Sequence, residues 1–153
     1  EYRVTPSAVM HASSSAGTQA GLHLGAVLAG ELLDGVAPPV IGVDVAKITN
    51  PLAEEVSRLV AGTAELLGVQ QIWENAGPGR GPTVLEGYLG PGYAVPSGGS
   101  SAALHLLART EGVILDPVYS AKGFHAVCES DLPGPIVFWH TGGTPALFAT
   151  TPH

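Results

Sequence analysis

Small and hydroxyl-bearing residues gather in the segment HASSSAGTQAGLHLGA, residues 11–26, between an apolar run and the spacing of an amphipathic helix. The first turn of a helix has unpaired N–H groups and the positive end of the helix dipole, and small residues there let an anion approach closely. Serine and threonine hydroxyls add further hydrogen-bond donors. These features predict a phosphate-binding loop, and Ser13, Ser14 and Ser15 would serve equally well as caps of the helix.

Two well-known nucleotide-binding motifs do not fit this loop. The sequence contains no GxxxxGK pattern, so the ATPase and GTPase classes are poorly supported. A dinucleotide site needs GxGxxG and an acidic residue about 20 residues later. Asp44 supplies such an acid, but Ser15, Gly17 and Thr18 stand where the tight-turn glycines belong. The pattern therefore disfavours an NAD site.

The elements that would carry the loop alternate between strands and helices. Apolar and β-branched runs predict strands at residues 4–12, 40–46, 83–85, 113–115 and 136–139. Helical spacing predicts helices at residues 18–33, 50–67, 97–110 and after Pro117. This alternation predicts an α/β fold with a parallel sheet flanked by helices. In such a sheet, ligands bind at the carboxyl ends of the strands, where residues 13–18 are expected.

The composition indicates a single folded unit, residues 1–153, that does not bind polyanions. The chain is 45% hydrophobic and has a formal net charge of −7. Its lysines and arginines are scattered, which disfavours a nucleic-acid partner. No apolar run reaches the length of a membrane span and no signal-peptide pattern is present. Because the chain has a single cysteine, Cys128, we expect a reducing, cytoplasmic location.

Several other residues receive structural interpretations. The histidines show no HxxxH or HExxH spacing, so no metal site is expected. Glu54 and Glu55 belong to a solvated helical face. One helix is expected to end at Asp34-Gly35, and the next is expected to begin at Asn50-Pro51. The residues expected in the interior are Cys128, Trp73, Trp139, Ala103, Leu104, Leu106 and Leu107.

Five ordered segments carry a resemblance to a known family. They are SSAGTQAGL (14–22), VIGVDV (40–45), GYLGPGYAVP (87–96), LLARTEGVILDPVYSAKGF (106–124) and FWHTGGTPALF (138–148). Together the segments resemble the C-terminal portion of D-cysteine desulfhydrase and 1-aminocyclopropane-1-carboxylate deaminase. These are pyridoxal 5'-phosphate (PLP) enzymes of fold type II, the tryptophan synthase β-like fold. The resemblance implies that PLP is the cofactor.

The resemblance assigns roles to individual residues. The opening loop becomes the cradle of the PLP phosphate, in a stiffer form, because the family usually has glycine where Ser14 and Ala16 stand. Two tyrosines match active-site tyrosines that donate or accept protons near the substrate. Two hydroxyl residues fall where the family contacts the pyridine nitrogen. The implied catalytic residues are Tyr93 and Tyr119, and the implied cofactor-binding residues are Ser14, Ser15, Ala16, Gly17, Thr18, Ser120 and Thr141.

The residue after DPVY separates two chemistries within the family. The cyclopropane-opening deaminases have glutamate there, whose charge keeps the pyridine nitrogen protonated. This chain has Ser120, and a hydroxyl stabilises the protonated ring far less. That favours β-elimination, in which the leaving group carries the electrons away. We therefore expect a carbon–sulfur lyase acting on an amino acid or a cysteine-derived thiol, with the deaminase activity as an alternative.

The resemblance also implies a lysine that this chain lacks. In the family the Schiff-base lysine lies in an N-terminal segment that precedes the phosphate loop. Lys47 follows a strand where the family uses no lysine, and Lys122 matches a lysine that is not the anchor, so both are expected on the surface. A second chain or an N-terminal segment, in a homo- or hetero-oligomer, is expected to supply the anchor. A domain cut from a larger protein and a lysine-less, non-catalytic phosphate-binding scaffold or regulatory subunit remain open.

Overall fold

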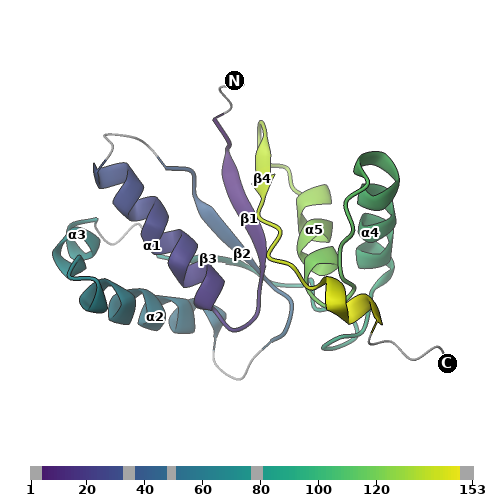
Figure 1. Cartoon of the computed structure of the whole chain (residues 1–153), viewed down its shortest axis with the longest axis horizontal. Coiled ribbons are helices and arrows are strands. Elements are labelled where there is room, and N and C mark those ends of the chain that lie inside the picture. The colour runs from purple at the N-terminus through teal and green to yellow at the C-terminus, as the bar shows by residue number, and fades with distance from the viewer. Residues whose placement is uncertain (1–4, 33–36, 48–50, 77–80, 149–153) are drawn as a thin grey trace.

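A parallel sheet of four strands forms the centre of the computed structural model, which describes residues 5–32, 37–47, 51–76 and 81–148 (Figure 1). The strands are β1 (Ala8–Ser13), β2 (Val40–Asp44), β3 (Thr83–Leu85) and β4 (Ile136–Phe138). Their order across the sheet is β3-β2-β1-β4, and every pair is parallel. The predicted α/β class with a parallel sheet is confirmed.

Helices cover both faces of the sheet. The helix α1 (Gly17–Leu32) packs on one face together with α2 (Leu52–Leu66) and α3 (Gln70–Asn75). On the other face, α5 (Ser120–Cys128) lies against the sheet and α4 (Gly98–Glu111) packs outside it (Figure 1). A short 3-10 helix, Thr144–Phe148, follows β4. None of the described helices is long and apolar enough to cross a membrane.

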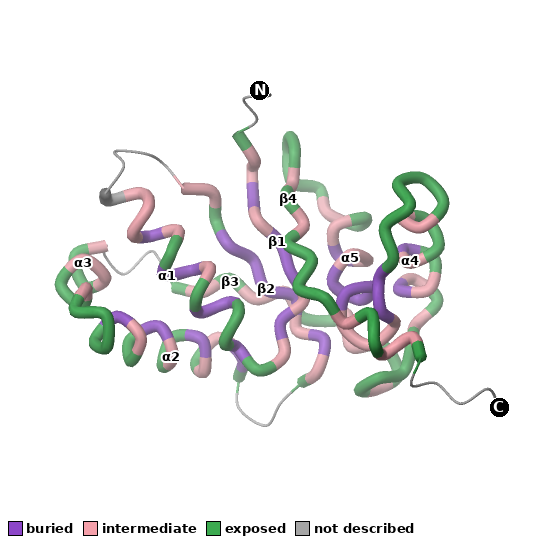
Figure 2. Tube along the Cα trace, in the orientation of Figure 1, coloured by how far each residue is buried: buried purple, intermediate pink, exposed green. Residues whose placement is uncertain are grey.

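The two central strands are nearly all buried because helices cover both of their faces. Met10, Ile41 and Val43 pack with Ala126 of α5 on one side. Runs of apolar residues are typical of such doubly covered parallel strands. In contrast, no residue from 131 to 148 is buried, so β4 and the segment after it form an exposed border of the molecule (Figure 2). Val137 is 39% exposed and Trp139 is 50% exposed.

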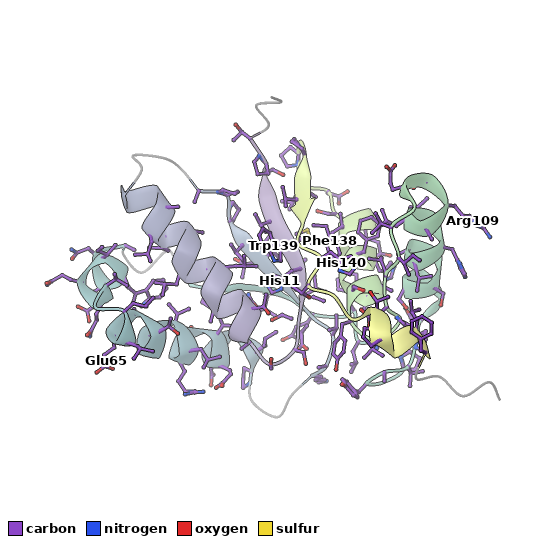
Figure 3. All side chains as sticks on the ribbon, viewed as in Figure 1. His11, Glu65, Arg109, Phe138, Trp139 and His140 are labelled. Carbon is purple, nitrogen blue, oxygen red and sulfur yellow. The ribbon has the colours of Figure 1, made fainter. Side chains whose placement is uncertain are left out.

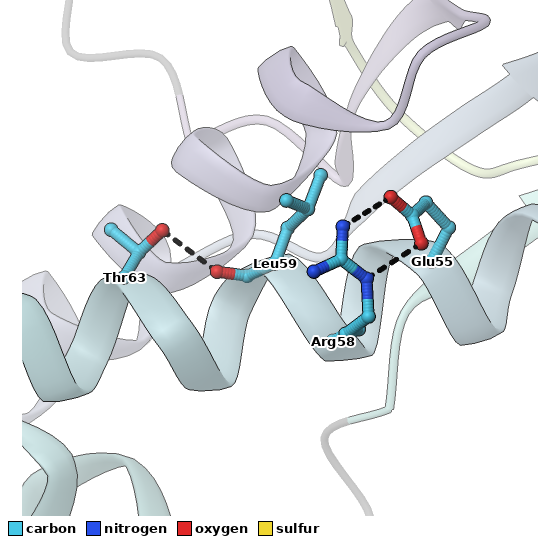
Figure 4. Close-up of polar contacts among 4 residues, drawn as sticks. All are labelled: Glu55, Arg58, Leu59 and Thr63. Carbon is cyan, nitrogen blue, oxygen red and sulfur yellow. Dashed lines mark hydrogen bonds and ion pairs between the residues drawn. The ribbon is translucent and has the colours of Figure 1, made fainter.

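The helix α2 shows which interactions hold the outer helices. Its inner face buries Leu52, Val56, Val60 and Ala64. On its surface, Arg58 donates to both carboxylate oxygens of Glu55, at 2.8 and 2.6 Å, and Thr63 Oγ1 donates to the Leu59 carbonyl at 2.7 Å (Figure 4). Exposed ion pairs contribute little to stability. The apolar inner face therefore anchors this helix.

Several predicted boundaries move when the chain folds. Pro51 occupies the N-cap of α2 rather than its first turn, and Asn50, Leu33 and the Asp34-Gly35 pair lie outside the described residues. The strand expected at residues 113–115 is wrong, because this stretch is an irregular connection from α4 to α5. Gly112 ends α4 in the left-handed conformation with φ 67°, and the chain then turns at Asp116. The helix α3 was not expected.

Four burial expectations are also wrong. Leu106 and Trp139 are each 50% exposed, and Cys128 is exposed at the end of α5. Trp139 directly follows β4, which lies at the edge of the sheet. Lys122, expected on the surface, is fully buried. The expected interior positions Ala103 and Trp73 are buried and half-buried, respectively.

His11 is fully buried in β1. Its Nδ1–H donates to the Ala12 carbonyl at 2.9 Å, and its Nε2 has no hydrogen-bond partner in the part of the chain that the structure describes. Burial lowers the pKa of His11 below the ordinary value of 6.5. The folded protein therefore holds this imidazole in its neutral form at neutral pH.

We expect mild acid to destabilise the fold through His11. As the pH falls below 6.5, His11 takes up a proton in the unfolded chain, whereas in the folded chain its lowered pKa keeps it neutral. Protonation therefore stabilises the unfolded chain, and the free energy of unfolding decreases. Urea unfolding at about pH 7.5 and about pH 5.5 should show this loss, and the loss should be smaller in His11→Gln. His105→Gln, at an exposed position of α4, should retain the full loss. An equal loss in His11→Gln would contradict the assignment.

Candidate functional site

A cavity of about 260 Å³ opens at the carboxyl end of β1. Three segments meet there: the loop between β1 and α1, the start of α5, and the loop after β4. The lining residues are Ala12, Ser13, Ser14, Ser15, Ala16, Thr18, Tyr119, Thr141, Gly142 and Gly143. None of them carries a charged side chain. The polar groups that the cavity offers to a ligand are therefore hydroxyl groups and backbone groups.

The loop after β1 presents hydrogen-bond donors to this cavity. The Ala20 N–H donates to the Ala16 carbonyl at 2.9 Å, which starts the helix. The N–H groups of Gly17 and Thr18 precede this bond and have no partner within an α-helix. Ser13 is 3% exposed, and its Oγ has no hydrogen-bond partner among the described residues. An orphaned buried hydroxyl beside unpaired amides is suited to an anion.

The conformation of Ala16 makes this turn possible. Ala16 adopts φ 66°, in the left-handed region that favours glycine, and is buried. An L-residue in this region costs about 1–2 kcal/mol. The strain agrees with the expectation of a stiffer loop at this position.

Gln19 braces the same loop against the sheet. Its side chain is fully buried, and its Nε2 donates to the Thr83 carbonyl of β3 at 2.9 Å. The side chain occupies the space above Gly42, where a Cβ atom would lie 2.0 Å from Gln19 Oε1. A side chain at position 42 would displace the Gln19 amide. The first turn of α1 is therefore fixed to both β2 and β3.

Asp116 supports the second wall of the cavity, which Tyr119 forms. Its carboxylate is fully buried, and Oδ1 accepts from the N–H groups of Val118 at 2.9 Å and Tyr119 at 2.7 Å. Oδ2 accepts from the N–H of Ser120 at 2.9 Å and from its hydroxyl at 2.5 Å. The carboxylate thus caps α5 and orients Tyr119. Sequence reasoning missed Asp116, although an aspartate before proline is a typical turn signal.

The two predicted tyrosines meet through their hydroxyl groups. Tyr93 and Tyr119 share a short hydrogen bond, and their rings pack edge to face at 6.0 Å. This hydrogen bond, with burial, raises the pKa of Tyr119 above its ordinary value. Tyr119 lines the cavity, whereas Tyr93 is 55% exposed and stands behind it. The Tyr119 hydroxyl therefore remains protonated at neutral pH.

The third wall comes from the HTGG segment after β4. In the view of Figure 3, His140, Phe138, Trp139 and His11 lie near the middle, well away from Arg109 and Glu65. The Gly142 N–H donates to His140 Nδ1 at 3.0 Å, so Nε2–H of that ring donates to the Ile114 carbonyl at 3.1 Å. His140 thereby fixes the loop that carries Thr141.

Gly143 packs this loop directly on the Asp116 turn. It has φ 107°, and a Cβ atom there would lie 2.3 Å from Asp116 Oδ2. A side chain at this position would displace the buried carboxylate. The second and third walls of the cavity are therefore packed as one unit.

Not every predicted site residue reaches the cavity. Ser14, Ser15, Ala16, Thr18, Tyr119 and Thr141 line it. Gly17 lies beside it in the first turn of α1. Ser120 is buried, its hydroxyl accepts from the Asp116 N–H at 2.7 Å, and it is not among the lining residues. Of the two residues assigned to the pyridine nitrogen, Thr141 is the one at the cavity.

Neither described lysine lies at the cavity. Lys47 is exposed on the loop after β2, where its N–H donates to Asp44 Oδ1 at 2.8 Å. Lys122 is buried, and its Nζ donates to the carbonyls of Leu89 at 2.6 Å and Gly92 at 2.9 Å. Burial lowers the pKa of Lys122 below its ordinary value. Within the described ranges, then, the cavity has no amine.

Comparison with known proteins shows which family of proteins this chain is similar to. Residues 1–142 match the family model described as pyridoxal-phosphate dependent enzyme. The chain is 37% identical to D-cysteine desulfhydrase of Klebsiella pneumoniae (strain 342) over 164 residues, which cover 100% of this chain and 45% of that protein. It is 37% identical to D-cysteine desulfhydrase of Salmonella typhi over 160 residues, 96% of this chain and 43% of that protein.

A solved structure shows the same likeness. The crystal structure of an ACC deaminase homologue superposes with a TM-score of 0.74 at 27% identity, covering 93% of this chain and 41% of that one. The chain therefore spans less than half the length of the relatives it matches. The resemblance stated from the sequence motifs is confirmed.

Proposed function

Because this chain belongs to the family of pyridoxal-phosphate-dependent enzymes, we propose that it forms the phosphate-cradling part of a carbon–sulfur lyase. The lyase would act on cysteine or a cysteine-derived amino acid. Cysteine and water would give hydrogen sulfide, ammonia and pyruvate, with cleavage of the bond between sulfur and the β-carbon. The observation that carries this proposal is a cavity built of donors, without a charged side chain, at the start of α1.

The residues present fit the phosphate of PLP, the cofactor of the family. A carboxylate in the lining would repel a phosphate, and the lining contains none. The orphaned Ser13 hydroxyl gains a partner when an anion enters. The amides of Gly17 and Thr18, in the first turn of α1 beside the cavity, lie at the positive end of the helix dipole. When bound, PLP supplies an electron sink for the substrate's α-carbon.

The remaining lining residues have roles in proton transfer and orientation. Tyr119 holds a proton at the cavity wall and exchanges hydrogen bonds with Tyr93 behind it. Such a pair can give a proton to a leaving sulfur and recover it through the outer tyrosine. The Thr141 hydroxyl, held by the loop that His140 fixes, would face the ring nitrogen. A neutral hydroxyl there favours elimination over reactions that need a protonated ring.

The anchoring lysine would come from a second chain or an N-terminal segment. The relatives are more than twice as long as the matched region, and no lysine from the described ranges lines the cavity. Val137 and Trp139 leave apolar surface exposed on the edge of the sheet that β4 forms. Exposed apolar surface of this kind is typical of an interface. The second chain or N-terminal segment that supplies the lysine would also complete the substrate side of the site.

The proposal is tested by borohydride reduction followed by denaturing mass spectrometry, and by a sulfide assay. The protein as isolated, with any co-purifying chain, is reduced after addition of PLP, and the modified lysine is located. We expect the adduct outside residues 1–153 and sulfide release from D- or L-cysteine. Release of ammonia from 1-aminocyclopropane-1-carboxylate without sulfide release would instead support the deaminase reaction of the solved neighbour's title. An absence of PLP binding would overturn the proposal.

Thr18→Val should weaken PLP binding about tenfold to a hundredfold, because it removes one hydroxyl donor to a charged phosphate. Valine has the same shape, so the fold should remain intact. Titration of PLP followed by absorbance measures the effect. The matched control is Thr110→Val on α4, whose hydroxyl donates to the Leu106 carbonyl at 3.0 Å, far from the cavity. Equal affinity in the two variants would remove Thr18 from the cradle.

A further inference from the structure

Lys122 is a buried cation without a carboxylate partner. Its side chain is fully buried, and no ion pair joins it to an acidic group of the described residues. Its ammonium instead donates to the Leu89 carbonyl at 2.6 Å and the Gly92 carbonyl at 2.9 Å. A buried charge costs more free energy than a methionine of similar size would. The stability of the fold alone therefore does not account for an ammonium at this position.

Both carbonyls belong to residues 89–95, the stretch that carries Tyr93. Gly92 and Val95 form an isolated bridge, and the Val95 N–H donates to the Gly92 carbonyl at 3.2 Å. The same Gly92 carbonyl accepts from Lys122, so the ammonium closes the turn from behind. The stretch of residues 89–95 contains two residues in the left-handed conformation, Gly90 with φ 70° and Ala94 with φ 59°. Few other described contacts hold this exposed stretch in place.

The other end of the tether is the helix that presents Tyr119. Lys122 lies in the first turn of α5, and Tyr119 is the N-cap residue of that helix. One side chain therefore joins the backbone that carries Tyr93 to the backbone that carries Tyr119. The hydroxyl–hydroxyl contact of the two tyrosines lies between these joined segments.

We propose that Lys122 is a positioning residue, which holds the Gly92–Val95 turn on α5 and so keeps the Tyr93 hydroxyl bonded to that of Tyr119. This role rests on the proposed function, in which the tyrosine pair moves a proton. Lys122 itself touches neither the cavity nor a substrate. Without the tether, Tyr93 would swing into solvent while Tyr119, held by Asp116, would stay in place.

A titration of Tyr119 tests the tether without any activity. The ring-carbon NMR signal of Tyr119 is followed against pH in protein with isotope-labelled tyrosine, and signals are assigned from tyrosine-to-phenylalanine variants. In the wild type the hydrogen bond from Tyr93 raises the pKa of Tyr119. Lys122→Met and Tyr93→Phe should both lower it toward its ordinary value. Arg109→Met, at an exposed cation of the neighbouring helix α4, should leave it unchanged.

Kinetics of the isolated holoenzyme then test the consequence. Lys122→Met and Tyr93→Phe should lower kcat by the same factor. The double variant should have the same kcat as Tyr93→Phe alone. Independent, multiplicative effects would overturn the proposal, as would a Tyr119 titration that Tyr93→Phe moves and Lys122→Met does not. If the wild type is not a lyase, the titration still shows whether Lys122 holds the tyrosine pair together. Failure of the proposed function is thereby distinguishable from failure of the proposed role of Lys122.

Folding of the variants has a defined meaning. If Lys122→Met does not fold, Lys122→Gln, whose amide can donate to one of the two carbonyls, is measured in its place. An intermediate Tyr119 titration in Lys122→Gln supports the tether. Failure of both variants to fold would make Lys122 a requirement of the whole fold rather than of the tyrosine pair, and would overturn the proposal.

Discussion

Tyr119→Phe should lower kcat for sulfide release by roughly 10²–10⁴-fold, the range that positioned proton donors typically contribute. Tyr119 is the hydroxyl-bearing ring in the cavity wall, and Asp116 fixes its backbone through the N–H bond at 2.7 Å. Phenylalanine keeps the ring and removes only the hydroxyl group. KM and PLP affinity should therefore change little, since the phosphate is held by the opposite wall.

The matched control for this variant is Tyr88→Phe. Tyr88 packs edge to face on His125 at 5.4 Å and does not line the cavity. It should retain wild-type kcat. If Tyr119→Phe loses PLP affinity and kcat in equal measure, Tyr119 supports the cofactor rather than a proton transfer. Full activity in Tyr119→Phe would remove the tyrosine pair from the mechanism.

Asp116→Ala should destabilise the protein by about 3–5 kcal/mol, the cost of leaving buried partners of a charged group unsatisfied. The carboxylate accepts from Val118, Tyr119 and Ser120, all at the start of α5. Its removal leaves these donors buried without an acceptor. A loss of this size is a large part of the stability of an ordinary domain. Urea unfolding measures it directly.

Asp131→Ala serves as the control, because Asp131 is exposed after α5. Its free energy of unfolding should stay within about 0.5 kcal/mol of the wild type. An Asp116→Ala variant as stable as Asp131→Ala would mean that water or another group satisfies the start of α5. In that case Asp116 would not be the residue that orients Tyr119.

The sequence was most informative where one local rule acts alone. The spacing of apolar residues placed the start of α1 at Thr18, one residue from its observed start at Gly17. The apolar run at residues 40–46 contains β2. At residues 113–115 the same rule failed, because three apolar residues between a helix end and a proline fit a strand and an irregular connection equally well. Only the tertiary structure, with β4 beside β1, decides between them.

The candidate site was predictable in its loop and less so in its supports. Hydroxyl residues beside a helix start indicate either an anion site or a helix cap from local sequence alone. The supports depend on contacts between distant residues: Lys122 binds a carbonyl 33 positions away, and Gly143 packs on Asp116. Ser120 looks the same in sequence whether its hydroxyl faces a ligand or its own turn. Such choices are made by packing, which a single sequence does not display.

The contacts of Gln19 with Thr83 and Gly42 affect how tightly the loop after β1 would bind a ligand. Because its amide is already bonded to the Thr83 carbonyl and its chain fills the space above Gly42, the start of α1 is ordered as part of folding. An arriving phosphate then has little backbone entropy left to remove, and preorganised donors bind more tightly for the same contacts. Part of the affinity of the cradle is thus set on the far side of the loop, by a glycine that the ligand never touches.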